Sequence, residues 1–203
     1  MLCKYAFVSE AGWRLRALLR TQRFYEVDVM VRLYKTHILS YLEGGTPALY
    51  HAAPSVLKPL DGLQESFLTE LGLTDVEALC DYKLAPLSMR RDISMLGLLF
   101  KVASGTAPPP ICKLFRSYNC SLASFGFQSC SQFHDKALHD PIEPTHPGII
   151  KRSAFGLIRV FNRLPQQAIN VKSTRIFQRR LQYMALQAAK SGKHDWQNMF
   201  RAS

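Results

Sequence analysis

Apolar side chains recur along most of this chain at spacings of three and four residues, which is the pattern of helices that bury one side. The clearest stripe predicts one helix from Val27 to the glycine pair at 44–45. The other stripes predict helices over residues 11–23, 54–71, 86–104, 154–164 and 174–191. No segment alternates apolar and polar residues as a strand does, and no repeat of fixed period is present. The sequence therefore predicts an all-α, irregular multi-helix array.

Several predicted helix ends also carry a chemical signal. Glycine follows the stripes at Gly72, Gly105 and Gly192, where its freedom to adopt positive φ angles suits the end of a helix. Thr74 and Glu77 have the spacing of a capping box, in which two side chains satisfy free amides at the start of a helix.

Some ring-bearing side chains fall on the predicted apolar stripes. His37 does so, and we interpret it as a hydrogen-bonded core histidine rather than a ligand or a catalytic base. Four aromatic residues also fall on predicted apolar stripes, namely Trp13, Phe155, Phe161 and Phe177. Such rings can stack on bases, but their spacing among aliphatic neighbours favours packing in the core.

The helical pattern stops between residues 105 and 148. Pro108–Pro110 forbids helix continuation, and the following residues are rich in Ser, Gln, His and Pro without a period. We therefore divide the chain into a helical region, a long loop or insertion, a basic helical pair and a tail. These parts cover residues 11–104, 105–148, 149–192 and 193–203.

The net charge of +11 is concentrated near one end. Residues 151–203 hold eleven Lys or Arg against a single acid, Asp195, whereas residues 1–150 are close to neutral. A near-neutral body with a basic end is the electrostatic pattern of proteins that contact phosphates. A solvated basic surface without a partner is the alternative.

The candidate phosphate contacts are cations that fall away from the apolar stripes of the last two predicted helices, or between them. They are Arg152, Arg159, Arg163, Lys172, Arg175, Arg179 and Arg180. Five or six such contacts would give a slope of roughly minus four to minus five in a plot of log affinity against log salt concentration. Nothing in the pattern reads base edges, so we expect largely sequence-independent binding to the backbone of RNA or DNA.

The long loop contains the ligand types of a zinc site. These residues are Cys120, Cys130, His134 and His139. The spacings of the last three are within reach of tetrahedral coordination. Nine residues separate the two cysteines, however, in place of the two to four of a tight zinc knuckle. Buried thiols and exposed histidines are therefore the preferred interpretation, and no cofactor is expected.

The pattern contains no recognisable catalytic centre. No two aspartates are adjacent, and Gly44–Gly45 is not followed by the Lys-Ser/Thr of a phosphate-binding loop. Nothing marks out a Ser-His-Asp triad either. We expect no enzymatic activity from these residues as they stand.

Other features favour an intracellular location. No run approaches the roughly 18 apolar residues that cross a bilayer, so no membrane contact is expected. The first residues have too short an apolar core for a secretory signal. Five cysteines, an odd number at irregular spacing, argue against a disulfide framework. Nucleus and cytoplasm both stay open.

Several segments, taken together in order and spacing, resemble one protein family. They are Leu33–Glu43, Leu60–Gln64 with Phe67-Leu68, Leu84–Asp92, Arg152-Ser153, and Phe161–Pro165 with Phe177. They resemble the part of non-LTR (LINE-type, jockey-like) retrotransposon reverse transcriptases that follows the catalytic palm. The resemblance covers most of residues 11–190.

This resemblance implies a helical thumb and post-thumb region that grips template RNA and the nascent hybrid in a larger RNA-directed DNA polymerase. The family's fingers, its palm with paired metal-binding aspartates, and its endonuclease domain have no counterpart in these residues. Mg²⁺ is therefore expected only if a longer chain supplies the palm.

Two functional hypotheses follow. The first is a non-catalytic C-terminal fragment of such a polymerase, which binds RNA or DNA backbone through its basic helical surface and associates with the rest of a reverse transcriptase. The second is a helical protein-interaction module, a domesticated or degenerate remnant of the element, without nucleic-acid function. In both cases, apolar stripes on the first two helices that a polymerase would cover favour self-association.

Overall fold

The structure is a computed structural model that describes residues 2–118, 133–143, 145 and 148–201. Within these residues the β pairing is limited to an isolated bridge between Ser117 and Leu138, and the all-α prediction is confirmed. The α-helices are α1 (Leu2–Leu19), α2 (Val27–Tyr34), α3 (Ser40–Gly44), α4 (Thr46–Leu49), α5 (Pro54–Glu70), α6 (Asp75–Cys80), α7 (Leu87–Ala103), α8 (Pro109–Cys112), α9 (Gly148–Lys151), α10 (Ile158–Asn162), α11 (Gln166–Ile169) and α12 (Thr174–Lys190). A π-helical turn, η2 (Lys35–Leu39), and 3-10 turns η1 (Gln22–Phe24), η5 (Ala154–Leu157) and η6 (Trp196–Asn198) complete the set.

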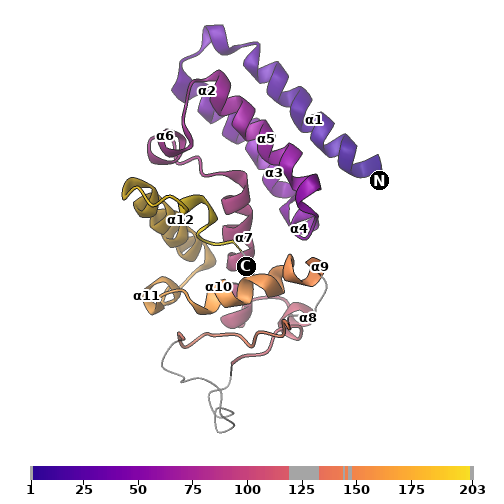
Figure 1. The fold of residues 1–203 in the computed structure, drawn as a ribbon, viewed down its shortest axis with the longest axis vertical. Coiled ribbons are helices and arrows are strands. Elements are labelled where there is room, and N and C mark those ends of the chain that lie inside the picture. Colours follow the sequence, from indigo (N-terminus) through magenta and orange to yellow (C-terminus); the bar gives the residue numbers. More distant parts are fainter. Residues whose placement is uncertain (1, 119–132, 144, 146–147, 202–203) are drawn as a thin grey trace.

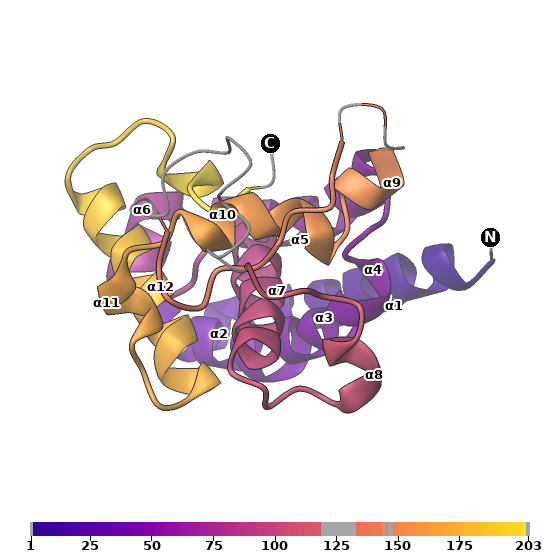
Figure 2. The same ribbon diagram turned by 90° about the horizontal axis from the view of Figure 1, so that it is seen from below.

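The helices form two groups that meet on the central helix α7 (Figures 1 and 2). Helices α1, α2, α3 and α5 lie at one end of the molecule, where α1 and α5 run side by side (Figure 1). In the second group, α12 packs along α7, and η5 and α10 pack across it. Helices α9 and α11 lie at opposite ends of α10 in both views.

Helix α7 contributes to two hydrophobic cores because it is apolar on several sides. Leu87 in its first turn joins the core of the N-terminal helices, where Tyr34 stacks on Phe67 with ring centroids 4.2 Å apart. Most of its other buried residues belong to a core shared with α10 and α12. Phe100 stacks there on Phe177 of α12, with ring centroids 4.6 Å apart. The second core thus joins residues from both sides of the long loop.

Helix α12 approaches α7 closely at Gly97. A Cβ atom at this position would lie 2.5 Å from Gln178 Nε2 and 3.2 Å from Thr174 Cγ2. Because Gly97 has no side chain, the first turns of α12 can lie directly against α7. This contact places Thr174 and Gln178 against α7.

The predicted helix signals are present. The Thr74 hydroxyl accepts the amide of Glu77 at 3.3 Å, and the Glu77 carboxylate accepts the amide of Thr74 at 2.8 Å, which completes a capping box on α6. Ser173 caps α12 by accepting the amide of Ile176. Gly192 follows α12 with φ +71°, and the glycines after α5 and α7 are also left-handed. These local predictions are confirmed.

The helix predicted from Val27 is continuous through α3, but it contains the π-helical turn η2. Such a turn holds an extra residue and shifts the side-chain register. Ile38 and Leu39 are consequently both buried, while His37 is exposed. The prediction of a core histidine is wrong because it assumed the register of a regular helix.

Trp13, predicted in the core, is exposed, and so is Ile176 on the apolar stripe predicted over residues 174–191. Trp13 in α1 has 61% of its surface exposed, and Ile176 in α12 has 45%. Helix α1 begins well before the predicted start at Ala11 and buries the side that holds Ala11 and Leu15. Trp13 lies two residues, or about 200° around the helix, from Ala11, and Ile176 lies about 100° from the buried Phe177. Each side chain therefore leaves the buried side of its helix.

Polar contacts of Arg91 and Asp92 tie α7 to the N-terminal helices, in addition to an ion pair between Arg90 and Glu43 of α3. Arg91 holds Asp61 of α5 through two N–O contacts of 2.7 and 2.8 Å. Tyr50, just after α4, donates its hydroxyl to Asp92 at 2.8 Å. Burial raises the pKa of the Asp92 carboxyl to about 6, against the lowering effects of the Tyr50 hydrogen bond and the Arg91 charge. The charged form of Asp92 therefore costs folding free energy at neutral pH.

We expect Asp92→Asn to raise the free energy of unfolding at pH 7.5 by about 1–3 kcal/mol. The folded pKa of about 6 lies above the unfolded value of 3.8, so the folded state binds the additional proton. The stability that the Asp92 carboxyl contributes is fully present at pH values below its unfolded pKa of 3.8. It is lost as the pH rises through its folded pKa of about 6. Asn cannot ionise and still accepts from Tyr50. Urea unfolding should therefore show a much smaller gain at pH 4.5, and equal gains at both pH values would contradict the prediction.

Candidate nucleic-acid interface

The solvent side of α12 holds three arginines and one tyrosine. Arg175, Arg179 and Tyr183 follow one another at intervals of one helical turn, and Arg180 lies three residues before Tyr183 on the same side. All four are exposed, and Tyr183 has 60% of its surface exposed. The opposite side of α12 is buried against α7 through Phe177 and neighbouring residues. Packing of the apolar side thus presents the cations to solvent.

The cations on this side of α12 form no ion pair within the described part of the chain. Helix α12 contains no acidic residue, and Arg175, Arg179 and Arg180 form no ion pair with any described residue. Arg163 and Lys172, on either side of α11, are also exposed and unpaired there. Helix α11 packs on α12, so Arg163 and Lys172 flank a helix that contacts the one carrying the three arginines. We call the five the α12 basic surface.

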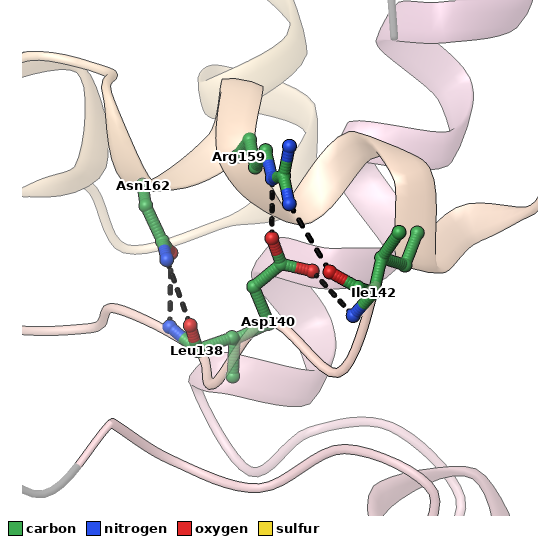
Figure 3. Close-up of polar contacts among 5 residues, drawn as sticks. All are labelled: Leu138, Asp140, Ile142, Arg159 and Asn162. Carbon is green, nitrogen blue, oxygen red and sulfur yellow. Dashed lines mark hydrogen bonds and ion pairs between the residues drawn. The ribbon is translucent and has the colours of Figure 1, made fainter. Parts of the chain in front are cut away.

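Arg159 is engaged within the protein instead (Figure 3). Its Nε forms an ion pair with the Asp140 carboxylate, and its NH2 group donates to the Ile142 carbonyl at 3.1 Å. A carboxylate already balances this charge, so Arg159 is not part of the α12 basic surface.

Asn162 anchors the same segment beside α10 (Figure 3). Its buried amide group donates to the Leu138 carbonyl at 2.7 Å and accepts the Leu138 amide at 2.9 Å. This pair of bonds satisfies a backbone unit that no helix or sheet satisfies. It places Asp140, two residues later, within reach of Arg159.

Arg152 is separated from the other candidate contacts. It follows α9, which lies at the opposite end of α10 from α11 (Figures 1 and 2). Arg152 is exposed. Five of the seven predicted cations are thus exposed without an ion pair on or beside α11 and α12, whereas Arg152 follows α9 and Arg159 is paired with Asp140.

The aromatic candidates near these cations pack inside the protein, which confirms their predicted role. Phe161 and Phe177 are fully buried, and Phe155 stacks on Phe115 with ring centroids 4.8 Å apart. Tyr183, by contrast, is an exposed ring that our sequence reasoning did not single out. Its place one turn after the arginines of α12, outside the apolar stripe, was the available signal.

The proposed zinc ligands lie only partly within the described residues, since Cys120 and Cys130 fall outside them. His134 is buried and uses both ring nitrogens. Its Nδ1 accepts a backbone amide at 3.2 Å, so Nε2 carries the proton and donates to the Phe161 carbonyl at 2.8 Å. Burial lowers the pKa of His134 and favours this neutral form. His139 is exposed, and the described residues contain no group of three side chains suited to a metal.

An apolar cleft of about 310 Å³ lies between the two helix groups. It is lined by Pro47, Tyr50, His51, Met95, Ile149, Ile150, Ser153, Ala154 and Phe155. The hydroxyl of Tyr50 is bonded to Asp92 and that of Ser153 to the Ile150 carbonyl, so these polar groups are already satisfied. The cleft is suited to an apolar side chain rather than to a charged ligand.

Comparison with known protein families, curated proteins and solved structures finds no match to this chain. The relation to reverse transcriptases stays a prediction from the sequence. No described helix is both long and apolar enough to span a bilayer.

Proposed function

We propose that this chain is a non-catalytic helical fragment of a retrotransposon-type RNA-directed DNA polymerase, and that it binds RNA or DNA backbone through the α12 basic surface. The observation that supports binding is the uncompensated charge of five exposed cations on and around a helix without acidic residues. Such cations replace the counterions condensed on phosphates, and the released ions drive association. The polymerase relation rests on the resemblance of the sequence segments.

Binding through this surface should be largely independent of base sequence. The arginines of α12 are long side chains on an exposed helix, suited to phosphates, and Tyr183 offers a ring that can stack on any base. Catalysis would require paired acidic residues from elsewhere. An in-frame Asp-Asp palm motif in the coding sequence upstream of Met1 would make this chain part of an active enzyme.

The experiment that tests the proposal is the salt dependence of binding. Five phosphate contacts predict a slope of log affinity against log salt of about −3.5 for single-stranded RNA and about −4.5 for duplex DNA. Fluorescence anisotropy with labelled oligonucleotides at several KCl concentrations measures both slopes. Absence of binding at low salt, or affinity that does not change with salt, would contradict the proposal.

A second candidate function is a helical protein-interaction module, which the apolar cleft favours. Ile149 lines this cleft and has 53% of its surface exposed, so a partner could bury it. A protein partner that stays bound after nuclease treatment and is lost in Ile149→Glu would favour this function over nucleic-acid binding.

A further inference from the structure

We infer that α1 and the turn after it form a second nucleic-acid contact, which stacks the bases of a single strand on Trp13 and Phe24. Both rings are unusually open to solvent, with 61% and 66% of their surfaces exposed. Large aromatic side chains are normally well buried. Neither ring takes part in an aromatic pair within the described residues, although Phe24 carries an arginine on one face.

Three arginines accompany the rings. Arg16 and Arg20 follow Trp13 by three and seven residues, and the Arg20 amide just past α1 still bonds to the Arg16 carbonyl, so both lie on the side of Trp13 over about 10 Å. Arg23 lies in η1 with its guanidinium 4.6 Å from the centre of the Phe24 ring. All three are exposed and form no ion pair with a described residue. We call these three arginines, Trp13 and Phe24 the α1 surface.

The neighbouring Arg14, by contrast, is engaged in contacts within the protein. It forms an ion pair with Glu10 at 2.9 Å and lies 4.3 Å from the centre of the Tyr41 ring. Residues 11–23 contain no acid that could pair with the remaining arginines. The α1 surface therefore combines arginines that form no ion pair with a described residue and two exposed rings, one of which carries Arg23 on one face.

A single-stranded nucleic acid matches both properties at once. Its phosphates pair with guanidinium groups, and its unpaired bases stack on aromatic rings with a gain of roughly 1–3 kcal/mol per base. In a duplex the phosphates are accessible but the base faces are stacked on one another. An acidic protein segment carries negative charge but has no bases that could stack on the rings. The combination of arginines and exposed rings therefore favours a single strand.

The α1 surface is separate from the α12 basic surface. Helix α1 belongs to the N-terminal group, whereas α12 packs on α7 in the other group (Figure 1). The inference consequently does not depend on the proposed function. A variant with Arg175→Gln, Arg179→Gln and Arg180→Gln removes the arginines of α12. Binding measured with this variant therefore reports on the α1 surface separately from the α12 basic surface.

Tryptophan fluorescence reports directly on this site. The chain contains two tryptophans, and Trp196 is buried with 6% of its surface exposed, so Trp13 is the accessible one. In the α12 variant, a single-stranded RNA of about eight nucleotides should quench the fluorescence, and Trp13→Phe should remove that quenching. Trp13→Leu and Phe24→Leu should each weaken binding by about 5- to 100-fold. Leu114→Ala, at an exposed apolar residue elsewhere, should leave affinity unchanged.

Three results would overturn the inference. Saturating RNA that leaves the fluorescence unchanged would show that Trp13 does not stack. Equal affinity for a duplex of the same sequence would show that only the backbone is bound. Equal quenching and affinity with poly-glutamate would indicate that the surface takes an acidic protein segment rather than a nucleic acid.

Discussion

Replacing Arg175, Arg179 and Arg180 together with Gln is expected to weaken the binding of single-stranded RNA about 100-fold at 0.1 M salt. Each phosphate contact adds about 0.7 to the slope of log affinity against log salt, and so contributes about 0.7 log units at 0.1 M relative to 1 M. The slope should therefore also become less steep by about 2. All three side chains are exposed and unpaired in the described structure, so the circular dichroism spectrum should not change.

A matched control separates the local surface from the net charge of the protein. Lys58, Lys113 and Arg116 are exposed and lie outside α12, and their replacement with Gln removes the same total charge. This control should weaken binding only slightly, because screening limits distant charges at 0.1 M salt to a reach of about 10 Å. A loss as large as that of the arginine variant would show that binding follows net charge rather than the α12 basic surface.

Asn162→Ala is expected to lower the free energy of unfolding by about 2–4 kcal/mol. The substitution leaves both the buried amide and the carbonyl of Leu138 without the partners they have in Figure 3. A buried polar group without a partner costs about 1–3 kcal/mol, and two such groups are created. The segment around Leu138 should also lose protection of its amides from hydrogen exchange.

Arg159→Gln is the control for Asn162→Ala, because both side chains contact the segment 138–142. It removes an ion pair whose arginine is more than half exposed, and such pairs contribute about 0–1 kcal/mol. Urea unfolding of the two variants under one buffer condition compares them directly. If Asn162→Ala cost no more than Arg159→Gln, the two hydrogen bonds of Asn162 would not hold this segment.

Four of the five residues of the segment Phe161–Pro165, on which the family resemblance partly rests, hold the fold together. Phe161 and Leu164 are buried, Asn162 bonds to Leu138, and Pro165 is the N-cap of α11. Arg163, which is exposed, is the one residue of this segment that belongs to the α12 basic surface. The segment therefore mainly shapes the turn between α10 and α12, and its effect on binding is indirect.

The sequence identifies the cations of the candidate site, but it does not show which of them form ion pairs within the protein. Arg159 and Arg179 both leave the apolar stripe of a helix, and nothing local distinguishes them. Arg159 meets Asp140 only because Asn162 holds the intervening loop beside α10. Trp13 was likewise assigned to the core because the side of α1 that α5 and α2 cover cannot be read from α1 alone.

The all-α class, most helix ends and the uneven charge follow from the amino-acid sequence alone. These features depend on residues a few positions apart, such as the Thr74–Glu77 capping box and the Ser173 cap, so they are encoded locally. The π-helical register at His37, the sharing of α7 between two cores, and the set of arginines without an ion pair become visible only in the folded chain. Each of these depends on packing between segments distant in the chain, where burial and partner geometry outweigh local preference.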